Sequence, residues 1–255
     1  GLAIVVESRF GRVLLDTGAS GDILLHNLDA AEVTPGSITA LVLSHAHRDH
    51  TGGLAVLLQR RPDLPVYAHP DLWRERYSRR SGRVRAVGLP ENVREALRAA
   101  APHLDAAPQE VLRGIWTTGE IRERPERDAD DRHLLVRSGD AWAPDPCRDD
   151  MGLVVECAQG LVLVCGCCHA GLLNTLRHVS KTFGAIPTAV VGGTHLITVD
   201  KAQLRHTVDL LRGYGPPALF PNHCTGEGAY AALAQAFGAR VSPFPAGTTI
   251  EFGTS

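Results

Sequence analysis

The chain has 255 residues, of which 44% are hydrophobic and 21% charged, and its formal net charge at pH 7 is −2. These values are ordinary for a globular domain, and the charge gives no electrostatic footprint for nucleic acid or an anionic membrane. No apolar run approaches the ~18 residues that span a bilayer, and no secretory signal pattern is visible. We therefore expect one domain over 1–255 in the cytoplasm, with no nucleic-acid or membrane partner.

The first part of the chain alternates strand and helix signals. Apolar runs over 2–7 and 12–16 flank a turn and predict a β-hairpin. Spacing of apolar residues and turn residues then predicts further elements. These are a helix at 22–31, a buried strand at 39–43, a helix at 53–60 and a short strand at 65–68.

Residues 70–146 differ from the rest in being rich in Arg, Glu, Asp and Pro. Two stretches, near 71–79 and 91–101, have helical character. We interpret the whole segment as an elaborated loop region or lid on the main domain, and its composition favours a solvated surface.

Regular patterning returns from Gly152. Two apolar runs, 153–157 and 161–165, are separated by a tight turn and predict a second hairpin. Helices are expected at about 171–181, 200–213 and 226–237, with strands at 188–191 and 218–220. Two halves that each begin with a hairpin and continue with alternating helix and strand predict mixed sheets with helices outside.

The segment SHAHRDHTGG, residues 44–53, concentrates metal-ligating side chains directly after the buried strand. His45 and His47 alternate, so both side chains can point the same way, while Asp49 and His50 turn the corner. Imidazole and carboxylate groups suit Zn²⁺ and neighbouring transition metals. Chance placement of HxHxDH between an apolar strand and Gly52–Gly53 is improbable, so the segment predicts a metal site.

This HxHxDH segment resembles the signature of the metallo-β-lactamase-fold superfamily, and the early Leu14–Gly18 turn is similar to its strand-DTG turn. Further segments are similar to one branch, the 7,8-dihydropterin-6-methyl-4-(β-D-ribofuranosyl)-aminobenzene-5′-phosphate synthase-like family. They are Gly166–Gly171 with Asn174, Gly192–Leu196, and His223–Gly226. The resemblance implies a four-layer αββα sandwich of two mixed β-sheets flanked by helices. It also implies a mono- or dinuclear metal site between the sheets, with Asp16 supporting the metal loop.

By this resemblance, His45 and His47 would bind one metal ion, and Asp49, His50 and His223 a second. The cofactor is then expected to be zinc, in two ions, with iron or manganese as alternatives.

The remaining ligands are less clearly marked, because the second hairpin ends in Cys167–Cys168–His169 where many superfamily members have Gly–Asp. His169 is the natural substitute, as a ligand of the first ion or in the bridging position. Asp149 or Asp150 would complete the ligand shell or hydrogen-bond to it. For Cys168, metal ligation and packing are both open, whereas Cys165 and Cys167 are expected to be small buried residues.

The chemistry expected of such a site is hydrolysis by metal-activated water, because bound divalent ions lower the pKa of water and stabilise developing negative charge. Asp49 would act both as ligand and as acceptor that orients the water. His195 would donate to a substrate phosphate or leaving group, or would be structural. No nucleophile elbow, GxGxxG or Walker A segment offers another mechanism.

Three functions compete for this sequence. The first is a metal-dependent hydrolase, or an enzyme that opens a cyclic phosphate, with a phosphorylated or heterocyclic (pterin-like) small molecule as substrate. The second is a lactonase or phosphodiesterase of the same fold. The third is a non-hydrolytic redox or ligand-binding protein that keeps its metal. The sequence leaves the oligomeric state open, and also the role of Thr117–Ile121, a stretch similar to one in the synthase-like branch.

Overall fold

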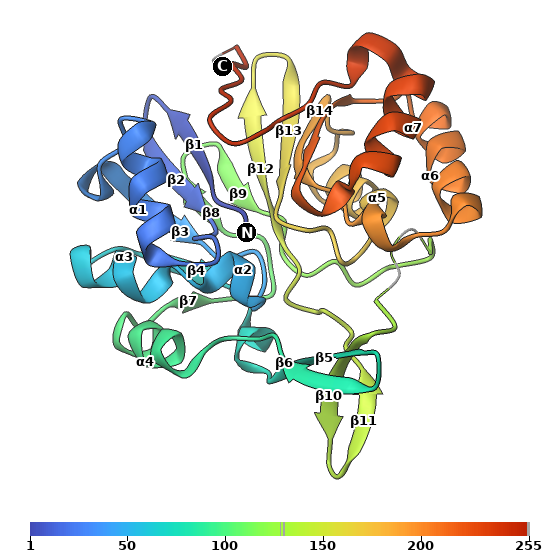
Figure 1. Cartoon of the computed structure of the whole chain (residues 1–255). Coiled ribbons are helices and arrows are strands. Elements are labelled where there is room, and N and C mark those ends of the chain that lie inside the picture. Colours follow the sequence, from blue (N-terminus) through green and yellow to red (C-terminus); the bar gives the residue numbers. More distant parts are fainter. Residues whose placement is uncertain (128, 130, 254–255) are drawn as a thin grey trace.

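The computed structural model describes residues 1–127, 129 and 131–253. Two main β-sheets face each other in the middle of the molecule, and helices cover the outer face of each (Figure 1). The predicted four-layer arrangement of mixed sheets and flanking helices is confirmed.

The first main sheet has the strand order β1-β2-β3-β4-β7. Its strands are β1 (Ile4–Ser8), β2 (Gly11–Leu15), β3 (Ile38–Val42), β4 (Val66–Ala68) and β7 (His103–Leu104). The hairpin β1–β2 is antiparallel and the other pairs are parallel, so the sheet is mixed. The parallel strands β2, β3 and β4 end at the same edge of the sheet, which is the edge that carries the HxHxDH loop.

The second main sheet has the strand order β15-β14-β13-β12-β9-β8. Its strands are β8 (Glu110–Leu112), β9 (Ile115–Thr117), β12 (Gly152–Cys157), β13 (Gly160–Cys165), β14 (Ala189–Gly193) and β15 (Ala218–Asn222). The strands β13, β14 and β15 are parallel and the remaining pairs antiparallel. The predicted second hairpin is therefore β12–β13, and the strands that follow it again end at one edge.

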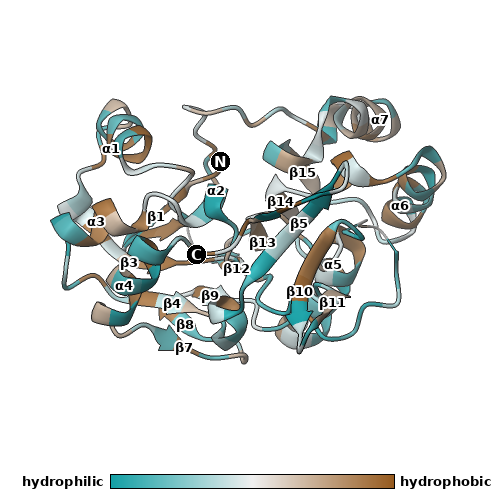
Figure 2. Ribbon diagram, turned by 60° about the horizontal axis from the view of Figure 1, so that its bottom comes forward, coloured by the Kyte–Doolittle hydropathy of each residue, from teal (hydrophilic) through white to brown (hydrophobic). Residues whose placement is uncertain are grey.

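The outer helices show apolar and polar sides, as helices at a surface must (Figure 2). They are α1 (Gly21–Ala30), α3 (Leu54–Arg60), α4 (Glu91–Ala99), α5 (Leu172–Phe183), α6 (Lys201–Gly213) and α7 (Glu227–Phe237). The one-turn helix α2 (Arg48–Thr51) belongs to the HxHxDH loop. Short 3₁₀ helices lie at Pro35–Ser37, Pro70–Trp73, Leu196–Thr198, His223–Thr225 and Gly238–Arg240. One apolar cluster joins α1, α3 and α4 to the first sheet, a second joins α5, α6 and α7 to the second sheet, and a third fills the space between the sheets.

The segment 70–146 contains more strand than the sequence suggested. It supplies β7, β8 and β9 to the two main sheets and builds a separate antiparallel sheet in the order β11-β10-β5-β6. Its strands are β5 (Arg76–Arg80), β6 (Arg83–Ala86), β10 (Leu134–Ser138) and β11 (Ala141–Pro144). This small sheet projects from one end of the molecule (Figure 1). Its role as a lid stays a prediction.

The prediction of a helix near 71–79 is wrong, because Pro70–Trp73 forms a short 3₁₀ helix and Arg76–Arg80 forms β5. Alternate residues of β5 serve opposite faces of the hairpin, which is the period of a strand. Arg76 is buried against acidic residues, whereas Tyr77, on the other face, contacts Trp142 edge-on. The helix expected at 91–101 is present as α4.

The stretch Thr117–Ile121 has a structural role in the fold. Thr118 Oγ1 accepts a hydrogen bond from the backbone N–H of Gly152, at the start of the second hairpin. Glu120 accepts hydrogen bonds from Arg122 and Arg148, with Arg148 Nε at 2.8 Å from the carboxylate. These contacts tie the segment 70–146 to the second main sheet. In the described part of the chain, no helix is both long and apolar enough to cross a membrane.

Candidate metal centre

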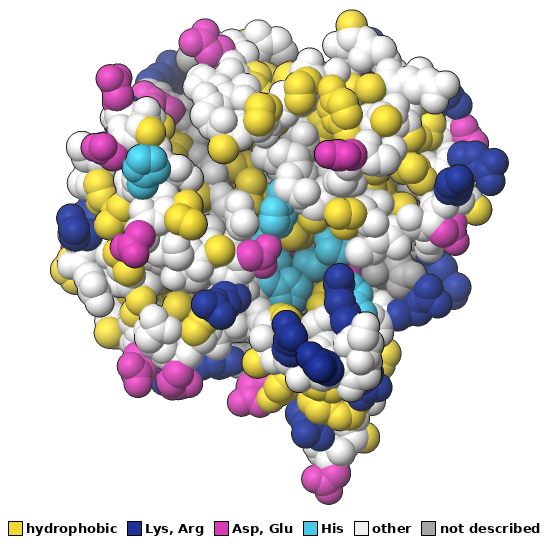
Figure 3. Space-filling model, viewed as in Figure 1, with side chains coloured by type: hydrophobic (Ala, Val, Ile, Leu, Met, Phe, Trp, Pro, Cys, Tyr) yellow, Lys and Arg dark blue, Asp and Glu magenta, His cyan; other side chains and the backbone are white. Residues whose placement is uncertain are grey.

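The residues proposed from the sequence as ligands meet at the edge where parallel strands of both main sheets end. His45 and His47 follow β3, and His169 follows β13. His195 follows β14 and His223 follows β15. Because the two sheets face each other, their strand ends converge, and histidine side chains reach the surface in the hollow between the two halves (Figure 3).

One cluster of donor atoms consists of Asp49, His50 and His223. His50 Nε2 lies 3.1 Å from His223 Nε2 and 3.6 Å from Asp49 Oδ2, and His223 Nε2 lies 3.3 Å from the same carboxylate oxygen. Ligands held about 2.0–2.1 Å from a tetrahedral metal are separated by about 3.3 Å. The three donors therefore have the spacing of ligands around one ion.

A second cluster consists of His45, His47 and His169. His45 Nε2 lies 3.0 Å from His47 Nδ1, and the His169 ring lies 4.8 Å from each of the other two rings, centroid to centroid. The Nε2 atom of His169 is buried without a hydrogen-bond partner among the described residues. Unpaired buried nitrogen is costly, and a bound cation would satisfy it. The two clusters adjoin, since the rings of His45 and His50 are 4.2 Å apart.

Asp16 orients the histidines from behind. Its Oδ2 accepts hydrogen bonds from His50 Nδ1 and from the hydroxyl of Ser44, both at 2.6 Å, and its Oδ1 accepts one from Ser44 N at 2.7 Å. The hydroxyl, having donated its proton to Asp16, accepts one from His45 Nδ1 at 2.8 Å. Both imidazoles thus carry their proton on Nδ1, which leaves the Nε2 lone pairs facing the centre, the usual arrangement behind a metal-binding histidine.

Asp131, which has no distinguishing pattern in the sequence, orients His169 of the second cluster and also His195. Its two oxygens contact His169 Nδ1 at 2.7 Å and His195 Nε2 at 2.8 Å. His169 is thereby left with its Nε2 lone pair toward His45 and His47. Asp131 lies in an Arg- and Asp-rich stretch typical of solvated surface, so only its proximity to the histidines in the fold identifies it.

Burial and neighbouring charges determine the protonation of the centre. Burial and the other imidazoles lower the pKa of His45 and of His47 well below the usual value, which keeps both neutral and able to bind a metal. Burial alone would raise the pKa of Asp49, but His223 and His50 outweigh it and lower that pKa. Burial would likewise lower the pKa of His195, but the interactions with Asp131 and Cys224 raise it to about 10.

Of the adjacent cysteines, Cys167 faces the histidines and Cys168 does not. Cys167 Sγ lies 3.1 Å from His50 Nε2 and belongs to donor groups with both clusters. Cys168 Sγ instead lies 3.2 Å from Cys165 Sγ in the apolar core beneath the second sheet. From the sequence, ligation is open for Cys168 and Cys167 is expected to be a packing residue. In the structure it is Cys167 that faces the donor clusters, whereas Cys168 lies in the core.

Asp149 and Asp150 stabilise the metal-binding loops by accepting hydrogen bonds from backbone N–H groups of those loops. Asp149 Oδ2 accepts a hydrogen bond from Ala46 N at 2.8 Å, between His45 and His47. Asp150 Oδ2 accepts one from Ala170 N at 2.9 Å, directly after His169. Of the two roles that the sequence left open, the structure therefore favours support through hydrogen bonds.

Close packing at the strand ends requires unusual backbone positions. Asp16, Cys168, His195 and His223 all have positive φ, between 50° and 63°. Such conformations are unfavourable for these residues and concentrate at functional sites. Gly166 is needed for a different reason, because a Cβ there would lie 2.2 Å from Ser44 Oγ and 3.0 Å from Asp16 Oδ2.

Comparison with known proteins agrees with this geometry. The family model described as the metallo-beta-lactamase superfamily matches residues 1–223. The chain belongs to the metallo-β-lactamase superfamily. Metal binding and metal-dependent hydrolysis are general properties of this superfamily, so its fold supports both in broad terms.

Individual superfamily members resemble the chain over nearly its whole length. The 7,8-dihydropterin-6-methyl-4-(beta-D-ribofuranosyl)-aminobenzene-5′-phosphate synthase of Methanocaldococcus jannaschii is 27% identical over 99% of this chain and 90% of its own. An uncharacterized protein of the same organism is 29% identical over 92% of this chain and 87% of its own. A crystal structure of a metal-dependent hydrolase of the β-lactamase superfamily superposes with a TM-score of 0.82 at 26% identity, covering 97% of this chain and 93% of that one. The resemblance to the synthase-like branch is confirmed.

Proposed function

We propose that this protein is a metal-dependent hydrolase that uses metal-activated water on a phosphorylated small molecule with a heterocyclic, pterin-like part. The observation that supports this most is the pair of adjoining donor clusters around His45 and His50. Their lone pairs face one another, and carboxylates fix the protons on the far side of the rings. Such an arrangement without a metal would leave nitrogen lone pairs opposed in a buried site.

We assign His45, His47 and His169 to one ion and Asp49, His50 and His223 to the other, with Cys167 between them. Histidine, carboxylate and thiolate donors together suit zinc or iron better than manganese, and zinc is our first assignment. When bound, such ions lower the pKa of water and polarise a phosphoryl or carbonyl oxygen. A cytoplasmic location, without nucleic-acid or membrane partners, stays our prediction.

The chain's own residues supply the other steps. Asp49 Oδ2 faces the centre and is available to accept a hydrogen bond that orients the attacking water. His195 is held by Asp131 through Nε2 and also interacts with Cys224, in a donor group that includes Cys167. With its pKa raised, His195 would keep a proton on Nδ1 to donate to a leaving group.

A second candidate is a synthase activity like that in the name of the M. jannaschii relative. It is favoured by the full-length similarity to that protein. The same site would then activate a phosphorylated pterin precursor toward a second substrate and not toward water. Incubation with a pterin phosphate, with and without an arylamine, separates the two candidates by product mass.

The experiment for the proposed function is metal analysis combined with a screen of phosphodiesters, lactones and cyclic pterin phosphates. His47→Ala is expected to lose both metal and turnover while the circular dichroism spectrum stays that of the parent chain. As a matched control, His26→Ala alters an exposed histidine of α1 and is expected to change neither. A His47→Ala variant with unchanged metal content and turnover would contradict the proposal.

A further inference from the structure

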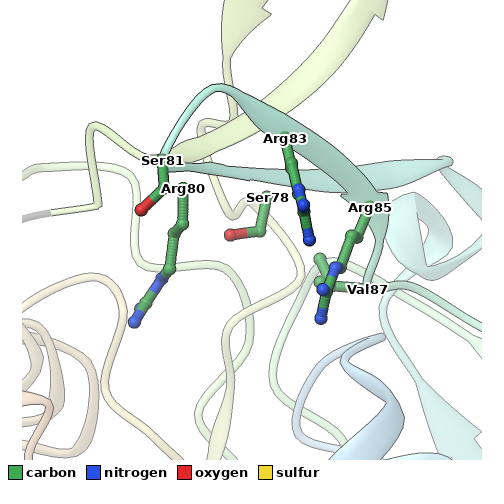
Figure 4. A pocket seen from close by; sticks show the side chains of 6 residues that line it. All are labelled: Ser78, Arg80, Ser81, Arg83, Arg85 and Val87. Atoms are coloured by element: carbon green, nitrogen blue, oxygen red, sulfur yellow. The ribbon is translucent and has the colours of Figure 1, made fainter.

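An arginine-rich hollow lies on the hairpin formed by β5 and β6. It has a volume of about 590 Å³ and is lined by Ser78, Arg80, Ser81, Arg83, Arg85 and Val87. In the hairpin, Arg80 pairs with Arg83 and Ser78 with Arg85, so these side chains share one face. The three arginine side chains project from the ribbon toward the same side (Figure 4).

The charge of this hollow is largely uncompensated. In the part of the chain that the structure describes, Arg83 and Arg85 are exposed and form no ion pair. Arg80 donates from Nη2 to the neutral imidazole of His133 at 2.9 Å, which leaves its positive charge in place. Like charges held together on one face repel each other, and a bound anion would relieve that repulsion.

Arg76, at the base of the same face, differs from these arginines. It is buried and paired with Asp145 at 3.0 Å and with Asp149 at 2.6 Å. The charge of Arg76 is therefore neutralised by buried carboxylates, and of these arginines only Arg80, Arg83 and Arg85 remain available to a ligand.

Two connections join this face of the hairpin to the metal centre. Asp149 bridges Arg76 to the backbone of Ala46, between the histidines of the metal loop. The carbonyl of Val87, which lines the hollow, accepts a hydrogen bond from Arg48 N at 2.9 Å, one residue before Asp49. Basic side chains accordingly border the histidine-lined hollow of the surface (Figure 3).

We propose that Arg80, Arg83 and Arg85 bind the phosphate group of the substrate while its reacting part lies at the metal centre. A phosphate monoester or diphosphate offers several charged oxygens, enough for more than one guanidinium fork, whereas one arginine suffices for a carboxylate. This inference rests on the proposed function, because it assigns the substrate class for the same site. In this arrangement the phosphate group is bound by the arginines and is not the group that reacts.

The test measures binding of D-ribose 5-phosphate to the metal-loaded full chain by isothermal titration calorimetry, with D-ribose as the uncharged probe. Removing one charge-assisted contact weakens binding about tenfold or more, so the double variant R83Q/R85Q is expected to bind about a hundredfold more weakly. Arg79→Gln is the control for the loss of a guanidinium outside the hollow, since it removes one positive charge from the opposite face of the hairpin, where Arg79 pairs with Val84. It is expected to bind within about twofold of the parent chain, because screened charges outside the hollow contribute little.

Three results would overturn the inference. They are ribose 5-phosphate binding that is equal in R83Q/R85Q and the parent chain, binding no tighter than that of ribose, and tighter binding of a single-stranded DNA oligonucleotide. The conservative variant R83K/R85K, which keeps the charge but not the fork, is expected to fall between. Metal content is measured on each sample: a parent chain without metal contradicts the proposed function, whereas normal metal with unchanged phosphate binding contradicts only this inference.

Discussion

The role of Asp16 gives the most specific prediction for the centre. Asp16→Asn keeps the size of the side chain, and asparagine tolerates the positive φ of 63° at this position. It replaces one of two oxygens that together accept three hydrogen bonds, from His50 and from both polar groups of Ser44. The perturbation therefore reaches the metal centre through proton positions and through the loss of one buried negative charge beside His50.

The expected loss of zinc affinity depends on the direction in which the new amide NH₂ points. If it faces His50 Nδ1, the ring must move its proton to Nε2, and the lone pair toward Asp49 and His223 is lost. If it faces Ser44 N, two buried donors oppose each other at a cost of about 1–3 kcal/mol. Loss of such a supporting carboxylate typically lowers metal affinity about 10–100-fold. We expect that range for zinc.

The assay is zinc titration against a chromophoric chelator, with Asp29→Asn as control. Asp29 is exposed on α1, so this variant removes the same charge without touching the centre. Circular dichroism checks that both variants stay folded. Zinc affinity of Asp16→Asn within about twofold of that of Asp29→Asn would refute the argument from proton positions.

Three further predictions concern packing, pH and the cysteines. Gly166→Ala is expected to lower both the melting temperature and the zinc content, since its new Cβ would lie 2.2 Å from a side-chain oxygen, whereas Gly213→Ala, with open space around it, should change neither. Hydrogen bonds from arginine lower the pKa of Glu120 to about 2, so its stabilisation is present above pH ~4.5 and is lost as the pH falls toward 2. Urea unfolding of Glu120→Gln should thus show a deficit of about 1–2 kcal/mol at pH 7 that vanishes near pH 2; a constant deficit would be contrary to this. Zinc affinity should fall about tenfold or more in Cys167→Ala and stay unchanged in Cys168→Ala, and the reverse order would show that the wrong thiol was assigned.

Features with a strong local pattern could be predicted from the sequence. The strands 39–43 and 161–165 are continuous apolar runs, and they are present as β3 and β13. The HxHxDH segment directly follows β3, so its histidines must lie at the end of that strand. His223 was assigned as a ligand by the family resemblance, from its position after the strand predicted at 218–220, and its ring does lie beside that of His50, 4.9 Å away.

Features that depend on contacts between distant segments could not be predicted. Asp131 lies in a charged stretch, and nothing local distinguishes an aspartate that meets His169 from one in water. The choice between Cys167 and Cys168 depends on the positive φ of Cys168, which turns its side chain into the core. The strand β5 resembled a helix because arginine is a good helix former, and its pairing with β6 and β10 overrode that preference.

The most direct measurement is an anomalous difference map from crystals of the full chain grown with zinc. We predict one peak between Asp49, His50 and His223, and a second between His45, His47 and His169. A map without density at either position, with zinc in the crystals bound only at the surface, would contradict the central claim that these strand ends form a metal centre.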